Sequence, residues 1–231
     1  MEIGFFLPIM LENSLQKLEA IDWKRERKTV LKTEDYGFES VGVPDHLQLG
    51  GGVNFEHFSI LSALAEATEK INLVTLVTCV PFRNPALTAK TAATIDVLSE
   101  GRFQLGLGAG WHEPEFDAYG YEYEDAKTRV DRLEEAAQLT RKVWTEEEVD
   151  FDGKFYQMDG CVCEPKPIDP HLMIGGKGKR IQKLAEKYAD EWNFLGSPEE
   201  MLERASEIEG VKISWFGPAL ISRDEEYLER L

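Results

Sequence analysis

The chain has few cysteines and no long apolar stretch, and each shortage excludes a class of protein. Three cysteines in 231 residues cannot form the disulfide framework of a small secreted protein. The longest apolar run, residues 71–80, is interrupted by Asn72, Thr75 and Thr78, whereas a membrane span needs roughly 20 apolar residues. The amino terminus has no basic region followed by an apolar run, so we expect no signal peptide. These observations predict a cytoplasmic protein with no membrane partner.

Basic residues and metal-ligating clusters are scarce as well. Lysine and arginine number 26 against 43 aspartates and glutamates, which gives a formal net charge of −17. A field of this sign repels phosphate backbones, so we expect no nucleic-acid partner. Cys161 and Cys163 are close enough in sequence to share a metal, but no second pair or nearby histidine completes a site. The sequence therefore predicts buried reduced thiols and no metal.

The chain does contain a regular alternation of strand-like and helix-like segments. Such alternation implies an α/β fold with a parallel sheet, and seven or more repeats make a TIM (β/α)8-type barrel the economical closure. We expect one domain over residues 1–231, with an insertion after strand four at about 145–170 that contains a hairpin. An eighth strand is evident only if 219–222 forms it, which leaves open a barrel trimmed at its C-terminal end. The predicted strands are 3–7, 39–43, 71–78, 103–107, 172–174, 191–194 and 211–216. The predicted helices are 22–36, 56–70, 84–98, 128–144, 181–188, one opened by a capping box at 197–200, and a charged helix at 223–231.

The stretch 103–115 is the part of the chain that says most about function. It begins as a strand and ends in glycines spaced GxGxG, at Gly106, Gly108 and Gly110. Such glycines let a backbone approach a flat ligand closely, where a Cβ would clash. A tight turn after a buried strand is the alternative interpretation. Trp111 follows the last glycine directly.

Other predicted strand ends also carry residues suited to a ligand site. A barrel places its chemistry at the carboxyl ends of its strands, so these ends should converge with 103–115 on one mouth. His46 follows the second strand, and its charge can change near neutral pH, which suits proton transfer beside a redox centre. A structural role is the alternative for this histidine. Glycines that open a helix present N–H groups to an anion, so the turn after the fifth strand is predicted to hold a phosphate, unless it is a plain βα turn. The residues of this turn are Gly175, Gly176, Lys177, Gly178, Lys179 and Arg180.

A series of motifs resembles the bacterial luciferase-like monooxygenase superfamily. The motifs keep the family's order and spacing from about residue 3 to residue 194. Within the superfamily they are most similar to the branch that uses the deazaflavin coenzyme F420. The motifs are 41–46, 78–85, 92–102, 106–115, 119–120, Arg129-x-x-Arg132-x-x-Glu135, 151–156, 165–167, 174–180 and 188–193.

The resemblance implies a TIM barrel and an F420-dependent oxidoreductase. The reaction would be hydride transfer between the coenzyme and a small organic substrate, with His46 near the reacting face and 175–180 holding the phosphate. Thr78 would lie at a bulge where the family often has a non-proline cis peptide bond. The implied contacts to the ring come from Asp45, Thr78, Ala109 and Gly110.

The residue after the GxGxG turn departs from one branch of the superfamily. Sugar-phosphate dehydrogenases place a glutamate there and an asparagine three residues later, whereas this chain has Trp111 and Pro114. Oxidation of glucose 6-phosphate with a glutamate acid is therefore not expected. Trp111 would instead form a wall of the pocket and favour an apolar or planar substrate. His46 then becomes the candidate proton donor or acceptor.

Two alternatives to the F420 enzyme stay open at this point. One is an FMN-dependent luciferase-like monooxygenase, and the other is a non-catalytic protein that binds a flavin or deazaflavin. The basic residues at 177–180 favour F420, because its polyglutamate tail is anionic. The presence of Asp45 and His46 together with the phosphate turn favours catalysis. By analogy with the family we expect a homodimer.

Overall fold

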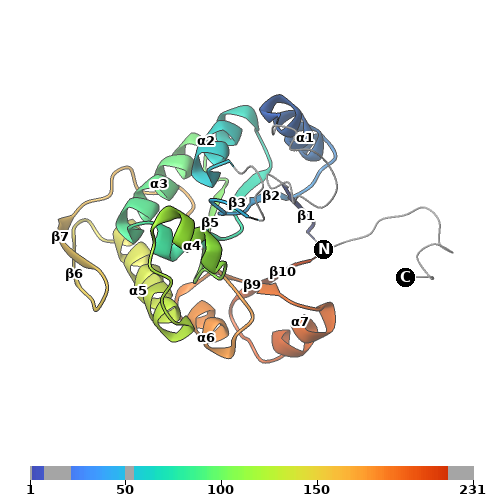
Figure 1. Ribbon diagram of the computed structural model, residues 1–231. Helices are drawn as coiled ribbons and strands as arrows, with labels where there is room; N and C mark the ends of the chain where they lie inside the picture. The colour runs from blue at the N-terminus through green and yellow to red at the C-terminus, as the bar shows by residue number, and fades with distance from the viewer. Residues whose placement is uncertain (1, 8–21, 50–54, 218–231) are drawn as a thin grey trace.

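The centre of the molecule is a curled sheet of parallel strands (Figure 1). The computed structural model describes residues 2–7, 22–49 and 55–217. Each strand pairs with the one before it in the path, and the short strand β4 (Thr78–Cys79) pairs with β5 beyond the end of β3. The α/β class and the parallel sheet agree with the prediction. The strands of the path are β1 (Gly4–Phe6), β2 (Ser40–Val43), β3 (Asn72–Thr75), β5 (Phe103–Gly108), β8 (His171–Gly175), β9 (Glu191–Leu195) and β10 (Lys212–Phe216).

Helices lie around the outside of this sheet (Figure 1). Their starts are set by local sequence, because Asp22, Asn84 and Asp125 each accept hydrogen bonds from first-turn N–H groups. Ser197 forms the predicted capping box with Glu200. None of the helices in the described ranges is long and apolar enough to cross a membrane. The outer helices are α1 (Trp23–Asp35), α2 (His57–Ala67), α3 (Pro85–Leu98), α5 (Ala126–Thr145), α6 (Lys179–Tyr188) and α7 (Pro198–Ala205).

The sheet is a half-barrel rather than a closed ring in the part of the chain that the structure describes. Its strands form a path from β1 to β10, and no ladder pairs these two edge strands. Side chains cross the gap instead. The rings of Phe6 and Phe216 lie 4.7 Å apart, and Lys212 Nζ is 2.7 Å from Glu2 Oε2. The segment 219–222, the sequence's only candidate for an eighth strand, lies outside the described residues, as does the predicted helix 223–231.

The predicted insertion is present as a two-stranded hairpin that projects from the body of the molecule (Figure 1). Strands β6 (Val149–Asp152) and β7 (Gln157–Cys161) pair antiparallel after α5 and before β8. The carboxylate of Glu135, on α5, accepts hydrogen bonds from the backbone N–H groups of Lys154 and Phe155, each at 2.9 Å. These bonds hold the hairpin turn on the outer helix, away from the sheet.

Helix α4 (Glu113–Tyr119) and the 3-10 turn η1 (Val80–Phe82) are not expected from the sequence. Both are too short to show a helical repeat of apolar residues. Their formation depends on packing, because Phe116 of α4 is fully buried against Phe82 of η1, with the rings 4.7 Å apart. In Figure 1, α4 lies in front of the strands. It therefore covers part of the sheet edge where the strands end.

Candidate active site

The strands β2, β4, β5 and β8 belong to one parallel sheet, so their carboxyl ends lie along the same edge, as predicted. The backbone N–H of Cys79, on β4, lies 2.9 Å from Asp45 Oδ2, just after β2. The rings of His46 and Trp111 lie 5.7 Å apart, which joins the end of β2 to the loop after β5. A cis peptide bond joins Leu76 and Val77, directly before Thr78, in the region where the family resemblance placed one.

His46 is held by a buried carboxylate from α4. Its Nδ1 lies 2.8 Å from Glu115 Oε1, although the two residues are 69 positions apart in the chain. Glu115 Oε2 accepts hydrogen bonds from the backbone N–H groups of Leu47 and Gln48, at 3.0 and 3.3 Å. Glu115 is only 2% exposed, so this carboxylate is withdrawn from water. This pair could not be predicted from the sequence, in which Glu115 is only the last residue of the 106–115 motif.

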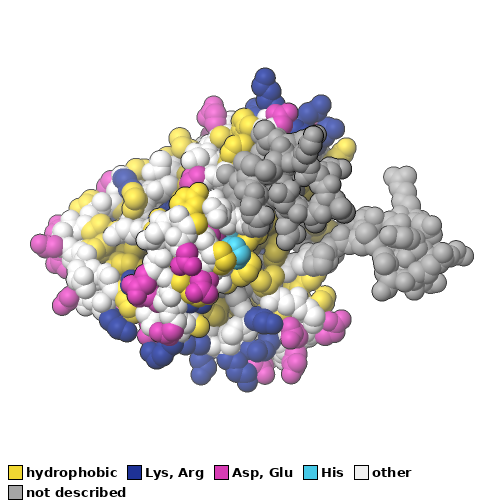
Figure 2. Space-filling view, in the orientation of Figure 1, with side chains coloured by type: hydrophobic (Ala, Val, Ile, Leu, Met, Phe, Trp, Pro, Cys, Tyr) yellow, Lys and Arg dark blue, Asp and Glu magenta, His cyan; other side chains and the backbone are white. Residues whose placement is uncertain are grey.

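Aromatic rings surround His46 on its exposed side. Trp111 is 64% exposed and meets the His46 ring edge to face. The His112 ring lies 5.0 Å from Trp111 and 6.4 Å from His46. The hydroxyl of Tyr123 donates to the carbonyl oxygen of Trp111 at 3.0 Å and holds this loop. In Figure 2, acidic side chains gather over α4 beside a histidine.

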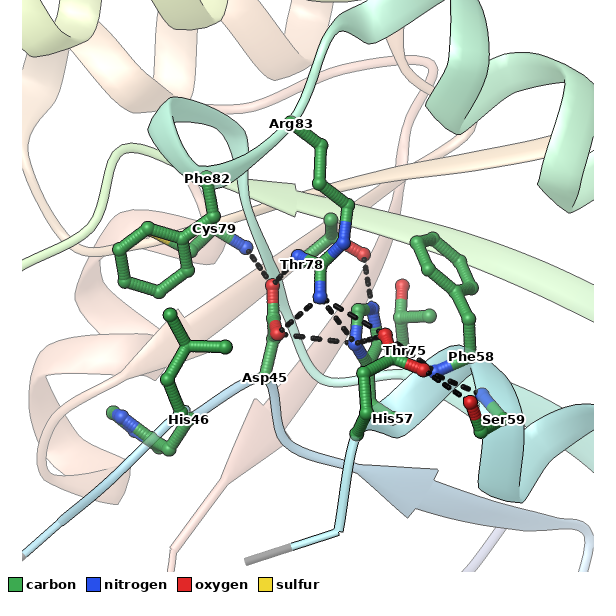
Figure 3. A network of polar contacts seen from close by, with 12 residues as sticks. Asp45, His46, His57, Phe58, Ser59, Thr75, Thr78, Cys79, Phe82 and Arg83 are labelled. Carbon is green, nitrogen blue, oxygen red and sulfur yellow. Dashed lines mark hydrogen bonds and ion pairs between the residues drawn. The ribbon is translucent and has the colours of Figure 1, made fainter. Parts of the chain in front are cut away.

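Asp45 is the centre of a buried network of polar contacts (Figure 3). It is 5% exposed, and its carboxylate accepts from Cys79 N–H and from the Arg83 guanidinium. His57 Nδ1 lies 3.0 Å from Asp45 Oδ1, and His57 Nε2 lies 3.2 Å from Thr78 Oγ1. His46 points away from this network in Figure 3. Asp45 and Thr78 therefore face the protein interior, and direct contact of either side chain with a ring stays a prediction.

Electrostatics stabilise the ionised forms in this network. Burial opposes ionisation of Asp45, but His57 and Arg83 outweigh it and hold the pKa of this carboxyl below its usual value. Burial likewise disfavours protonated His57, but Asp45 and then Glu56 raise the pKa of its imidazole above the ordinary value. Burial, followed by the charges of Asp45 and Glu115, raises the pKa of the Cys79 thiol. This thiol is a structural group and not a nucleophile.

The turn after β8 has the features of an anion site. Gly176 has a φ of +136°, a conformation that suits only glycine, and Gly178 caps α6 with no side-chain hydrogen bond to the first-turn N–H groups. Lys177 and Lys179 are exposed, and Figure 2 shows basic side chains over α6. Arg180 instead points to α5, where it pairs with Asp131 at 2.5 Å. A pocket of about 700 Å³ lies beside the turn, lined by Phe6, Gly176, Lys177, Leu195, Gly196, Phe216 and Gly217.

The glycines at the strand ends make room for one side chain, Val77. A Cβ on Gly108 would approach Val77 Cγ2 to 2.6 Å, and a Cβ on Gly175 would approach Val77 Cγ1 to 2.8 Å. A Cβ on Gly110 would meet the Cys79 sulfur at 2.8 Å. The GxGxG glycines are therefore needed for close packing between strands at this edge. Ala109 is half-buried beside them, and its contact with a ring stays a prediction.

Three functional candidates are missed by the sequence: Glu115, His57 and Arg83. Glu115 and Arg83 lie inside motifs that carry the family resemblance, which is the signal that could have found them. His57 lies in no such motif and opens an ordinary amphipathic helix. Only its tertiary contacts with Asp45 and Thr78 mark it as part of the site.

The profile of the luciferase-like monooxygenase family matches residues 1–211. The chain belongs to this family. Pyrimidine monooxygenase RutA of Rhizobium rhizogenes is 36% identical over an alignment of 210 positions, which covers 84% of this chain and 56% of that protein. RutA of Methylobacterium radiotolerans is 33% identical over an alignment of 251 positions, which covers 97% of this chain and 65% of that protein. The chain thus spans a little more than half the length of these luciferase-like relatives.

Solved structures of the family share the fold. An F420-dependent secondary alcohol dehydrogenase in complex with an F420–acetone adduct superposes with a TM-score of 0.78 at 25% identity, covering 93% of this chain and 68% of that one. Monooxygenase RslO1 from Streptomyces bottropensis gives a TM-score of 0.79 at 20% identity, over 100% of this chain and 74% of that one. At this identity the second likeness concerns the fold alone.

The prediction from the motifs of an F420-dependent oxidoreductase that transfers a hydride is wrong. Relatives that are 36% and 33% identical carry the name pyrimidine monooxygenase, whereas the F420-dependent dehydrogenase is more distant at 25%. The error has a chemical cause. Flavin and deazaflavin share a tricyclic ring and a phosphate-bearing chain, so both require the same glycine turns and anion site. The strand-end motifs therefore indicate the superfamily without separating its cofactors.

Proposed function

We propose that this chain is a flavin-dependent monooxygenase that uses FMN and oxidises a small planar heterocycle of the pyrimidine class. The observation that carries the proposal is the 36% identity to a pyrimidine monooxygenase over 84% of the chain. The exposed indole of Trp111 beside His46 supports it, because an aromatic face suits a flat heterocyclic substrate.

The residues at the sheet edge fit FMN. The uncapped first turn of α6 and the glycines Gly176 and Gly178 offer N–H groups to a phosphate, and Lys177 and Lys179 add positive charge. The adjoining pocket of about 700 Å³, with Phe6 and Phe216 in its wall, offers an apolar surface at the same edge. Ala109 and Gly110 would lie behind the ring, as the family resemblance implies.

The chain's own side chains have distinct tasks in this proposal. A bound reduced flavin supplies the electrons and the oxygen activation that monooxygenation requires. His46 would exchange a proton with the ligand, and Trp111 would orient the substrate ring. The network around Asp45 holds the 44–48 loop against η1, so the position of His46 is fixed before any ligand binds.

Ligand titration tests the cofactor. We expect FMN to quench the tryptophan fluorescence of the purified protein and to lose its own fluorescence on binding. The protein should bind FMN more tightly than oxidised F420. Replacing Lys177 and Lys179 by alanine should weaken the affinity for FMN by about tenfold or more, which is the effect of losing a charge-assisted contact. The affinity for riboflavin, which has no phosphate, should not change. Lys183→Ala, an exposed change on the same helix, is the matched control. Preference for F420, or equal losses for FMN and riboflavin, would contradict the assignment.

Turnover tests the reaction. With reduced FMN, uracil and ¹⁸O₂, we expect a product that contains one labelled oxygen, the other being released as water. His46→Gln should lower kcat by about 10²–10⁴-fold, the usual contribution of a general acid or base, with FMN binding retained. Binding of FMN without oxidation of any pyrimidine would instead indicate the non-catalytic flavin-binding alternative.

A further inference from the structure

We propose that Glu115 is a positioning residue that fixes the tautomer of His46, so that Nδ1 carries the proton and Nε2 is the atom that exchanges a proton with the ligand. The use of Nε2 in catalysis rests on the proposed function. The tautomer itself does not, because it follows from contacts within the chain.

The two oxygens of Glu115 have separate partners. Oε2 accepts from the backbone N–H groups of Leu47 and Gln48, at 3.0 and 3.3 Å. Oε1 lies 2.8 Å from His46 Nδ1 and has no other hydrogen bond among the described residues. An ionised carboxylate only accepts hydrogen bonds. The short contact therefore requires a proton on Nδ1, and a neutral imidazole with Nδ1–H has its lone pair on Nε2.

Other charged and titratable groups near His46 do not compete for Nδ1. Asp45 precedes it in the chain, but its carboxylate is occupied by Cys79 N–H, Arg83 and His57. His112, at the start of α4, approaches with its ring centroid no nearer than 6.4 Å. In Figure 3 the His46 ring points away from the Asp45 network. No described residue forms a hydrogen bond with Nε2, which is the atom that the proposal assigns to the ligand.

A purely structural role for Glu115 explains only half of its contacts. Tying α4 to the 46–48 loop needs an acceptor for the Leu47 and Gln48 N–H groups, which Oε2 supplies. The contact between His46 Nδ1 and Glu115 Oε1 is not needed to hold α4 to this loop, because Leu47 and Gln48 of the same loop already bind Oε2. The second oxygen instead orients the imidazole, which is the usual task of a carboxylate behind a catalytic histidine.

Glu115→Gln provides a sharp test because glutamine has one acceptor and one donor end. The backbone N–H groups of Leu47 and Gln48 can only donate, so the amide oxygen should turn to them. The amide NH₂ then faces His46 Nδ1, which must give up its proton and accept. We therefore expect the substitution to invert the tautomer to Nε2–H while the shape of the side chain is kept.

Long-range ¹H–¹⁵N NMR of the ligand-free protein reads the tautomer directly. The chain has four histidines, and the His46 signals are assigned by their loss in His46→Gln. The spectra are recorded at about pH 8.5, above the ordinary imidazole pKa of about 6.5. We expect a proton on Nδ1 alone in the wild type and on Nε2 alone in Glu115→Gln. Glu113→Gln, the same change on the exposed side of α4, should match the wild type.

The outcomes separate this proposal from the proposed function. A proton on Nε2 in the wild type overturns the positioning role, whatever the activity, and this result does not depend on whether Glu115→Gln folds. An unchanged tautomer in a folded Glu115→Gln also overturns it. In the loaded enzyme, Glu115→Gln should lose about 10²–10⁴-fold in kcat with FMN affinity and KM close to wild type. If the protein does not bind FMN, the proposed function is wrong, but the tautomer measured in the ligand-free protein is unaffected.

Discussion

Single residues at this site act mainly on one another. The buried carboxylate of Asp45 contacts both Arg83 and His57, and the other ring nitrogen of His57 contacts Thr78. A buried charge is tolerated only while its partners and hydrogen bonds remain. The network therefore behaves as a unit, and removing its centre should cost more than the loss of any one hydrogen bond.

Asp45→Ala is expected to lower the free energy of unfolding by about 3–5 kcal/mol, because Arg83 and His57 would lose their buried carboxylate partner and keep only the part-exposed Glu56. Urea denaturation followed by circular dichroism measures this. Asp35→Ala, an exposed change at the end of α1, should stay within about 0.5 kcal/mol of wild type. Similar losses in both variants would show that the network does not act as described.

The raised pKa of His57 predicts a pH-dependent contribution to stability, because Asp45 and Glu56 favour its protonated form in the fold. That contribution is fully present below the unfolded histidine pKa of about 6.5, and it is lost as pH rises through the higher folded pKa. The stability difference between wild type and His57→Gln should therefore shrink as pH rises above about 6.5. Urea denaturation at a series of pH values measures it, and a constant difference would contradict the assignment.

Elements meet at this site through glycines. The β5 glycines lie where the neighbouring strands and the Val77 side chain come closest. The same strand therefore packs in the middle of the sheet and ends at the candidate site. A Cβ on Gly106 would lie 2.3 Å from the Thr75 carbonyl oxygen and 2.7 Å from Met173 Cε. The turn before α6 is different, since a Cβ on Gly178 would find nothing nearer than Ile181 Cγ1 at 3.8 Å.

Gly106→Ala should therefore destabilise the protein by about 1–3 kcal/mol, the usual cost of overpacking a core. Gly178→Ala is the matched comparison. Its φ of −70° suits any residue, so the change should be neutral or stabilise by up to about 1 kcal/mol through the unfolded chain. Equilibrium denaturation without ligand gives both values. An unaffected Gly106→Ala variant would mean that the strands can separate at this edge without cost.

The whole molecule carries a net charge of −17. Self-repulsion of this size destabilises the compact state, and added salt screens it within a Debye length of about 8–10 Å at physiological ionic strength.

The homodimer expected from the family is not tested by the structure and stays a prediction, to be measured by sedimentation.

Sodium chloride should therefore raise the Tm of the protein at neutral pH. The increase should become smaller as the pH approaches the isoelectric point of about 4.7, where the net charge vanishes. Differential scanning fluorimetry over a salt series at both pH values measures the effect. A salt dependence of equal size at the two pH values would show that screening of the net charge is not its cause.

The sequence by itself determined the order and type of the strands and of the longer helices, and it determined the superfamily. The strands and helices could be predicted because caps such as Asn84 and Ser197, and the spacing of apolar residues, act between positions a few residues apart. The superfamily was indicated by the resemblance of the motifs. The sequence also placed His46, Trp111 and the glycine turns at strand ends. It did not determine the cofactor, because flavin and deazaflavin require the same turns.

Only the tertiary structure decided which side chains work together. Glu115 reaches His46 across 69 positions, and His57 joins Asp45 and Thr78. It likewise turned Arg180 toward Asp131 and left the described sheet open between β1 and β10. Contacts of this kind depend on how the sheet curls and how α4 docks on it. No periodicity along the chain records them, because the energy that forms them comes from packing between distant segments.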